Sequence, residues 1–257
     1  MPLSRTLAGI LLALGLAWPA FGSACEKTLR WSDDPPFSMR AANGEIHGMQ
    51  IELHREILGD LGCRLRLLEL PWARALAELE AGRLDILPGA FKTPERELYA
   101  HFSQPVLLSR NMLFLRQDAL KRWPINRLLD LRNTDFRLGA QIGVAYGPDY
   151  DLLLQDAEFV RSIQRASSRR ALWQMVALGR IDGLIADELT GLYELRQAGL
   201  DAQITMSSVV VSDTPAGTAF SKRSNDSAFV QAFNKRIEAA RKDGRYQAIL
   251  RRHNATP

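Results

Sequence analysis

Short apolar strands alternate with helices in two successive passes along this chain. The phrase AGRLD at 81–85 recurs as LGRID at 178–182, each time as a helix stop that leads into a buried strand. Such alternation predicts parallel sheets covered by helices, so we expect an α/β protein with two lobes of one plan. The expected strands are 29–31, 65–70, 84–87, 136–144, 159–166 and 181–186, and the expected helices are 48–61, 72–81, 169–178, 188–198, 227–242 and 246–252.

No low-complexity or proline-rich linker separates the two passes. We therefore expect extended segments to join the lobes, with one crossing near Arg116 and the other near Gly217. About 230 residues remain after a predicted leader is removed. That length suffices for one large domain or for two smaller lobes.

The N-terminus has the pattern of a secretory signal. Arg5 supplies its positive charge, residues 7–18 form an apolar core, and a small-residue exit follows. This core is shorter than the roughly 20 apolar residues that span a membrane. We expect the signal peptide, residues 1–24, to be cleaved after Gly22 or Ala24 and the mature protein to be exported to the periplasm.

Charge and motif content argue against several classes of protein. The net charge of +4 is spread along the chain, so nucleic acid is not an expected partner. No glycine-rich phosphate motif is present. The histidines have neither the spacing of a metal site nor that of a Ser-His-Asp triad, and we expect no cofactor, no metal and no catalytic residue. These histidines are His47, His54, His101 and His253.

The two cysteines, Cys25 and Cys63, each precede an expected strand. In an exported protein two cysteines commonly pair, and these two lie at one end of the sheet if their strands are neighbours. The closed loop of 38 residues would contribute about 3 to 4 kcal/mol in the chain-entropy account. Two alternatives are that both thiols are free and that Cys25 is lipidated as the first mature residue.

A candidate anion site follows the expected strand 84–87. Thr93 suits an N-cap and Pro94 the first position of a helix, whose free N–H groups attract an anion. Arg96, one turn further, can grip a carboxylate with two hydrogen bonds. Since loops at the carboxyl ends of strands bind ligands in open α/β sheets, we expect a small anionic or zwitterionic ligand here.

Further short motifs follow one another in a fixed order along residues 28–253. They are Pro35-Pro36-Phe37, Gly44 through Gly48, Gly82-Arg83-Leu84-Asp85, Thr93-Pro94-Glu95-Arg96, Phe102-Ser103-Gln104-Pro105, Gly179-Arg180-Ile181-Asp182 with Asp187, and Asn234 through Tyr246. In this order and spacing the chain resembles bacterial periplasmic solute-binding proteins of the polar amino-acid-binding type, the receptors of ABC importers, as a divergent member.

The resemblance implies a type II periplasmic-binding-protein fold with two strand crossovers between its lobes. Lobe 1 would comprise residues 25–115 and 218–257, and lobe 2 residues 116–217. A small polar ligand would bind between the lobes as a hinge closes. The implied partner is an inner-membrane ABC permease, and the receptor would act as a monomer.

The resemblance also assigns roles to three residues. Phe37 would stack on the ligand, Arg96 would pair with its α-carboxylate, and Asp187 would take its α-ammonium. Each has a plainer alternative: Phe37 as lobe core, Arg96 as a solvated partner of Glu95 or Glu97, and Asp187 as a helix N-cap.

The chain departs from the family pattern at two points of the expected cleft. Phe91 stands where relatives have Ser or Thr, in a shortened loop, and Gly147 is followed by Pro148, which has no N–H to donate. The ligand is therefore either an amino acid held differently or another small polar or aromatic compound. The further candidates for the cleft wall are Trp72, with the core as its alternative, and Ala90, Phe91, Thr93, Tyr146 and Gly147.

We expect a binding receptor that is not an enzyme. Two other functions stay open. Some exported dehydratases resemble these receptors, and a receptor can also present its ligand to a membrane sensor as a separate partner.

Overall fold

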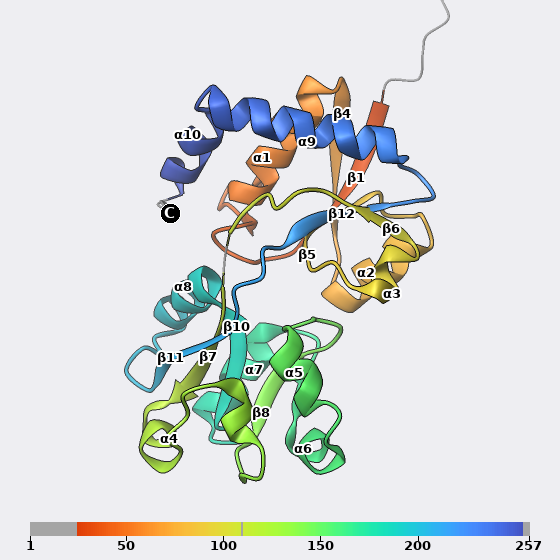
Figure 1. Ribbon diagram of the computed structural model, residues 1–257. Coiled ribbons are helices and arrows are strands. Elements are labelled where there is room, and N and C mark those ends of the chain that lie inside the picture. Colours follow the sequence, from red (N-terminus) through yellow and green to blue (C-terminus); the bar gives the residue numbers. More distant parts are fainter. Residues whose placement is uncertain (1–24, 109, 254–257) are drawn as a thin grey trace, which may run out of the picture.

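Two five-stranded sheets, each covered by helices, form an upper and a lower lobe in Figure 1. The computed structural model describes residues 25–108 and 110–253, and the expected signal peptide lies outside them. The fold class is α/β, as the sequence predicts. No helix within the described residues is long and apolar enough to cross a membrane.

The first sheet combines parallel and antiparallel strands. Its strands, in their order across the sheet, are β4 (Cys63–Glu69), β1 (Cys25–Trp31), β5 (Ile86–Ala90), β12 (Gly217–Ser221) and β6 (Ala100–Phe102). β1 runs parallel to β4 and β5, whereas β12 runs antiparallel to β5 and β6. The helices of this lobe are α1 (Met49–Asp60), α2 (Trp72–Glu80), α3 (Pro94–Glu97), α9 (Ser227–Lys242) and α10 (Arg245–Arg252), and a hairpin of β2 (Met39–Arg40) and β3 (Ile46–His47) precedes α1.

The second sheet repeats this mixed plan. Its strands, in order, are β11 (Ile204–Ser212), β7 (Asn111–Arg116), β10 (Gly183–Asp187), β8 (Leu138–Gln141) and β9 (Gln164–Ala166). β10 and β9 run parallel to β8, and β7 runs antiparallel to β10 and β11. Its helices are α4 (Gln117–Arg122), α5 (Pro148–Leu153), α6 (Ala157–Ser162), α7 (Arg169–Ala177) and α8 (Glu188–Ala198), with a 3-10 turn at Leu128–Leu131.

The chain changes sheet earlier than the sequence predicts on its first crossing. β7 already belongs to the second sheet, so this crossing lies before Asn111 and not near Arg116. The return crossing ends where β12 begins, at Gly217, as expected. Leu107 and Ala216 form an antiparallel bridge between the two crossing segments. We propose this bridge as the boundary between the lobes.

One expected strand is a helix. Residues 159–162 belong to α6, and only β9 is extended in the region predicted as strand 159–166. The Asp156 side chain accepts hydrogen bonds from the backbone N–H groups of Glu158 and Phe159, which caps the helix. This local cap outweighs the apolar character of Phe159 and Val160.

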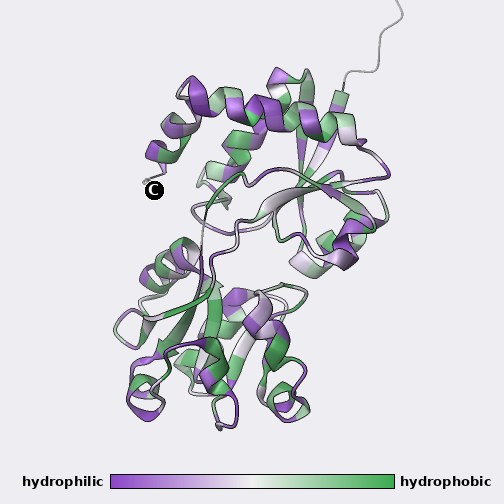
Figure 2. Cartoon of the chain, viewed as in Figure 1, coloured by the Kyte–Doolittle hydropathy of each residue, from purple (hydrophilic) through white to green (hydrophobic). Residues whose placement is uncertain are grey.

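Each lobe has its own hydrophobic core. In lobe 1, Leu29, Leu58, Phe220 and Phe233 are fully buried in one cluster between the first sheet and its helices. Burying one such side chain stabilises the fold by roughly 1.5–3 kcal/mol. Figure 2 shows the strands of the lower lobe largely green, while α9 carries purple as well as green stretches along its length. A second cluster of buried apolar side chains forms the core of lobe 2.

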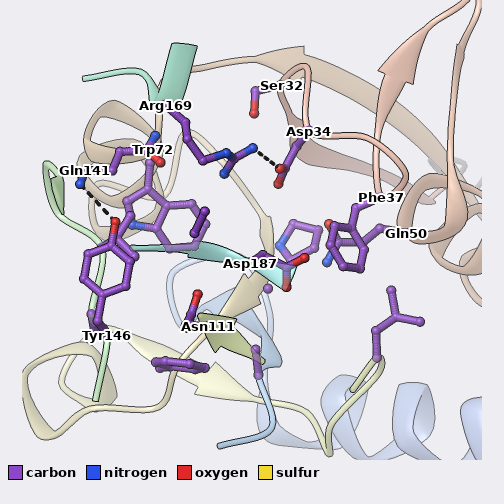
Figure 3. Close-up of a pocket in the computed structure, with 18 of the residues that line it drawn as sticks. Ser32, Asp34, Phe37, Gln50, Trp72, Asn111, Gln141, Tyr146, Arg169 and Asp187 are labelled. Atoms are coloured by element: carbon purple, nitrogen blue, oxygen red, sulfur yellow. Dashed lines mark hydrogen bonds and ion pairs between the residues drawn. The ribbon is translucent and has the colours of Figure 1, made fainter. Parts of the chain in front are cut away.

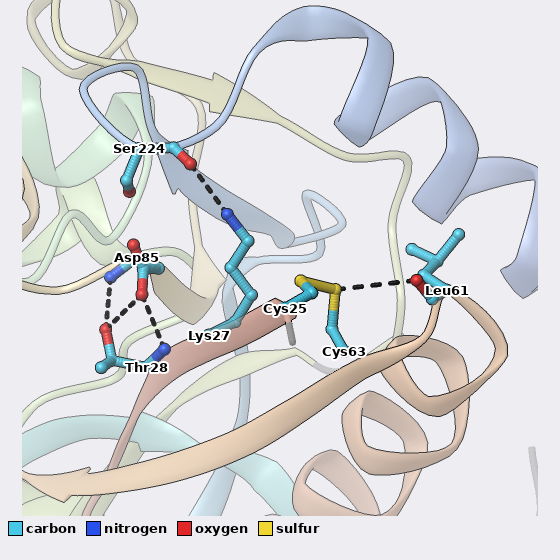
Figure 4. Close-up of a disulfide and its surroundings, with 7 residues drawn as sticks. All are labelled: Cys25, Lys27, Thr28, Leu61, Cys63, Asp85 and Ser224. Carbon is cyan, nitrogen blue, oxygen red and sulfur yellow. Dashed lines mark hydrogen bonds between the residues drawn. A yellow bond between two sulfur atoms is a disulfide. The ribbon is translucent and has the colours of Figure 1, made fainter. Parts of the chain in front are cut away.

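A disulfide joins Cys25 and Cys63 (Figure 4). The two residues are register partners at the ends of β1 and β4, with their Cα atoms 4.4 Å apart. The pairing is therefore the expected one. Free thiols and a lipidated Cys25 do not agree with this structure.

Candidate ligand-binding cleft

A cavity of about 250 Å³ lies between the two sheets and is lined by residues of both lobes. Figure 3 shows Phe37, Trp72, Tyr146, Arg169 and Asp187 around this space. Residues at or next to the carboxyl ends of β1, β5, β8 and β10 line it, so these strand ends face the space between the lobes. This is the position in which open α/β sheets bind ligands.

Arg96 reaches the cavity from the start of α3. Thr93 caps this helix, since its hydroxyl oxygen accepts from the Arg96 backbone N–H at 3.4 Å. The buried guanidinium donates from Nη1 to the Phe91 carbonyl at 2.9 Å and from Nη2 to the Gly143 carbonyl of lobe 2 at 3.1 Å. Arg96 thus already spans the cleft.

The Arg96 guanidinium forms no salt bridge with any described residue. Glu97, one expected partner, pairs with Lys92 at 2.8 Å instead. Burial lowers the pKa of Arg96, and the charges of Tyr99 and Glu95 offset this only in part. A buried cation without a paired anion is costly, so an anionic ligand group placed here would be strongly stabilised.

Trp72 also spans the cleft, although the core was its plainer alternative. It opens α2, and its indole Nε1 donates to the Gly143 carbonyl at 3.0 Å. The guanidinium groups of Arg30 and Arg96 lie 5.5 Å and 5.9 Å from the centre of its ring. These distances are those of cation–π contacts, so Trp72 orients two cations at the cavity wall.

Arg30 is a cleft residue that the sequence reading missed. It lies on β1, and its guanidinium donates to the Leu70 carbonyl at 3.0 Å and to the Ser32 hydroxyl at 2.5 Å. Burial lowers the pKa of Arg30, while the charge of Asp34 raises it. A charged residue inside the apolar strand Leu29–Trp31 was the signal that could have revealed it.

Arg169 at the start of α7 is the second missed residue. It donates to Asp34 of lobe 1 at 2.6 Å and to Glu194 of lobe 2 at 2.7 Å. Burial alone would lower the pKa of Arg169, but the two carboxylates outweigh it and raise this pKa. Asp34 is therefore half of an ion pair between the lobes.

Phe37 and Asp187 each show their plainer alternative, and both also line the cavity. Phe37 is buried in the core of lobe 1 and also lines the cavity. The Asp187 carboxylate caps α8 by accepting from the N–H groups of Leu189 and Thr190 at 3.0 and 3.1 Å. It lines the cavity as well, since it ends β10. Both remain candidate ligand residues.

The other expected residues divide between the cavity and its surroundings. Phe91 and Tyr146 line the cavity, and the Tyr146 hydroxyl accepts from the Gln141 N–H at 2.9 Å. Burial raises the pKa of Tyr146, which keeps its phenol neutral. Thr93 and Gly147 lie on a groove outside the cavity, and Ala90 is fully buried in the lobe core.

The model of the bacterial extracellular solute-binding proteins, family 3, matches residues 30–256. The chain belongs to this family. Its fold is the type II periplasmic-binding-protein fold, which confirms the expected fold class and the resemblance.

Two relatives of this solute-binding protein come from Escherichia coli (strain K12). The L-cystine-binding protein TcyJ is 24% identical over 216 residues, which are 84% of this chain and 77% of TcyJ. The ABC transporter arginine-binding protein 1 is 23% identical over 248 residues, 93% of this chain and 96% of that protein. These low identities agree with a divergent member.

Solved structures share the fold at equally low identity. An ancestral arginine-binding protein bound to arginine has a TM-score of 0.75 at 21% identity, covering 90% of this chain and 98% of that one. A histidine kinase sensor domain has a TM-score of 0.76 at 20%, covering 90% and 96%. AncCDT-1, an ancestral amino-acid-binding protein and precursor of cyclohexadienyl dehydratase, has 0.69 at 24%, covering 89% and 95%.

Proposed function

We propose that this solute-binding protein is a periplasmic receptor for an amino acid or a related small polar compound. It captures the ligand between its lobes and delivers it to an inner-membrane ABC permease. The family supports this role, as do two of its relatives, an L-cystine-binding protein and an arginine-binding protein. The divergent loop residues leave the identity of the ligand to experiment.

The observation that carries the proposal is the buried guanidinium of Arg96. It lines a cavity between two lobes and has hydrogen bonds to carbonyl oxygens but no salt bridge with a described residue. Carbonyl oxygens do not neutralise a cation. A ligand carboxylate at Arg96 would therefore supply the missing negative charge and accept hydrogen bonds from the guanidinium. Arg30, whose guanidinium also lies near the Trp72 ring, adds to the positive potential at this wall.

The opposite wall suits the other end of a zwitterion. Asp187 ends β10 in lobe 2 and provides a carboxylate for an ammonium group. Phe37 and Trp72 supply ring faces, which attract cations and pack against apolar ligand atoms. A ligand that contacts Arg96 in lobe 1 and Asp187 in lobe 2 bridges the lobes and favours their closed arrangement.

A melting-shift screen tests this function. Mature protein would be partially unfolded and refolded to remove carried-over ligand, then heated with amino acids, amines, carboxylates and aromatic compounds. A ligand at 100 times its dissociation constant adds about 2.7 kcal/mol to the free energy of unfolding. If none of these classes shifts the melting temperature, the proposal fails.

Arg96→Ala tests the site within the same screen. We expect the ligand-induced shift to disappear while the melting temperature without ligand changes little. Arg64→Ala is the matched control, because Arg64 is exposed and pairs only at the surface with Glu26. An unchanged shift in Arg96→Ala would remove Arg96 from the binding site.

Two alternatives are an exported enzyme and a partner that presents its ligand to a sensor. Each has a neighbour that shares the fold, AncCDT-1 for the enzyme and a histidine kinase sensor domain for the sensory role. Mass spectrometry after long incubation separates an enzyme from a receptor: ligand recovered unchanged supports the receptor, and a new mass shows turnover. Co-purification with a permease, rather than with a membrane kinase, separates the importer role from the sensory one.

A further inference from the structure

Three potential metal ligands meet on the outside of lobe 1. His47 ends β3, Glu52 lies in the first turn of α1, and His253 caps the C-terminal end of α10. One ligand atom from each lies within 4.8 Å of the others. None of the three lines the ligand cleft. The cluster is therefore separate from the proposed receptor site.

The cluster is held in place by its surroundings. The His253 side chain is 10% exposed and that of Glu52 is 22% exposed. His253 Nε2 lies 2.7 Å from Glu52 Oε1, while Arg252 donates to the other carboxylate oxygen at 2.9 Å. The rings of His47 and His253 are stacked, with centroids 6.2 Å apart. These side chains thus lack the freedom of ordinary surface residues.

Two imidazoles and one carboxylate are a donor set that zinc binds. Zinc takes such ligands at about 2.0–2.2 Å, which places ligand atoms roughly 3.3 Å from one another around a tetrahedral ion. In the structure His253 Nε2 and Glu52 Oε1 lie closer than this, at 2.7 Å, and all three ligand atoms lie within 4.8 Å of one another, so modest side-chain rotations have to adjust the site around an ion. Imidazole donors favour transition-metal ions over Mg²⁺ and Ca²⁺, which prefer oxygen ligands.

We propose that His47, Glu52 and His253 bind one divalent transition-metal ion of the zinc class. The ion takes the place of the proton shared between His253 and Glu52, with water completing its coordination. Arg252 keeps its hydrogen bond to the distal oxygen of Glu52 and so orients the carboxylate. Because the ligands come from β3, α1 and α10, the ion ties the C-terminal helix to lobe 1 and stabilises that lobe.

Calorimetric titration with ZnCl₂ alone tests the site. The mature protein is used without an affinity tag, since a polyhistidine tag binds zinc and His253 is close to the C-terminus. It is first treated with a chelator. We expect one zinc ion per chain, a higher melting temperature with zinc, and a visible absorption band when Co²⁺ replaces zinc.

His253→Ala and Glu52→Gln should each weaken zinc binding by about tenfold or more, the loss that even an outer partner of a metal ligand causes. His47→Ala is the variant of choice if these unfold, because its described contact is a ring stack only. His101→Ala is the control and should bind zinc normally. Equal affinity in wild type and His47→Ala, or no binding to the wild type, would overturn the site.

Discussion

Arg169 of lobe 2 lies 2.6 Å from Asp34 of lobe 1, and this ion pair closes one side of the cleft. Glu194, from the same lobe as Arg169, forms a second ion pair with the guanidinium at 2.7 Å. The Arg169 guanidinium is therefore fixed by a carboxylate of lobe 2 and donates to a carboxylate of lobe 1. The two lobes thus share an electrostatic contact that forms without any ligand.

Asp34→Asn should weaken ligand binding about tenfold without unfolding either lobe. Hydrogen bonds to charged groups contribute about 1.5–3 kcal/mol, and this one joins the two lobes across the cleft. Calorimetric titration with the ligand from the screen measures the change. Glu69→Gln, which disrupts an exposed pair with Arg40, is the control. An unchanged dissociation constant in Asp34→Asn would show that the pair does not favour closure.

Arg169→Met should lower the free energy of unfolding more than Asp34→Asn does. Removing the cation leaves the partly buried Asp34 and Glu194 without their ion-pair partner, which costs up to about 3–5 kcal/mol, the value for a fully buried pair. Removing Asp34 leaves Arg169 paired with Glu194. Urea unfolding monitors the difference, and the opposite order of stability would contradict this account.

Trp72→Phe should weaken ligand binding about fivefold. The substitution keeps an aromatic ring near Arg30 and Arg96 but removes the hydrogen bond to Gly143 across the cleft, and such a bond contributes about 1 kcal/mol. Trp123→Phe provides the control, since its Nε1 donates to Asp135 within lobe 2 at 3.1 Å. Both variants are compared by calorimetric titration. An equal loss in the control would argue against a role in closure.

Stability should fall between about pH 6.5 and pH 4 in part through His54. This side chain is fully buried, and burial lowers its pKa to about 4 despite a hydrogen bond with the Gln50 carbonyl. Below its unfolded pKa of about 6.5 the unfolded chain binds a proton that the folded chain refuses. The contribution of neutral His54 to the free energy of unfolding is therefore complete above about pH 6.5 and is lost as the pH falls toward 4.

His54→Gln should flatten this part of the stability profile relative to wild type, by about 3 kcal/mol at most. The amide can still bond Thr218, which lies 2.9 Å from His54 Nε2. His101→Gln, measured by the same urea titrations, controls for the removal of any imidazole. Parallel pH profiles for wild type and His54→Gln would contradict the prediction.

Replacing Cys25 and Cys63 together by Ala should lower the free energy of unfolding by about 3–4 kcal/mol, because the disulfide closes a 38-residue separation. Urea unfolding with and without reductant measures this, and reductant should affect only the wild type. Two alkylatable thiols in unreduced protein would contradict the bond itself.

Much of the fold was predictable because local signals and sheet patterns agree. The expected helix 48–61 is α1 within a residue at each end. β7 was assigned to the wrong side of the crossing because an apolar strand can join either sheet, and only pairing with β10 and β11 decides between them. The length of a continuous apolar run does not reveal where the chain leaves one lobe.

The candidate site was predictable where its residues lie together in one local sequence motif. Thr93 and Arg96 lie within one helix start, so their arrangement is encoded locally. The contact between Asp34 and Arg169 joins residues 135 positions apart, and no spacing rule connects them. His47 and His253 are likewise scattered in sequence and meet only because α10 packs beside α1.

The Cys25–Cys63 bond has a consequence for where the receptor can work. A sulfur atom bonded to another sulfur cannot also form the thioether that attaches a lipid. Oxidation at Cys25 therefore excludes a thioether-linked anchor at this residue, and a lipid could be attached there only after the disulfide is reduced.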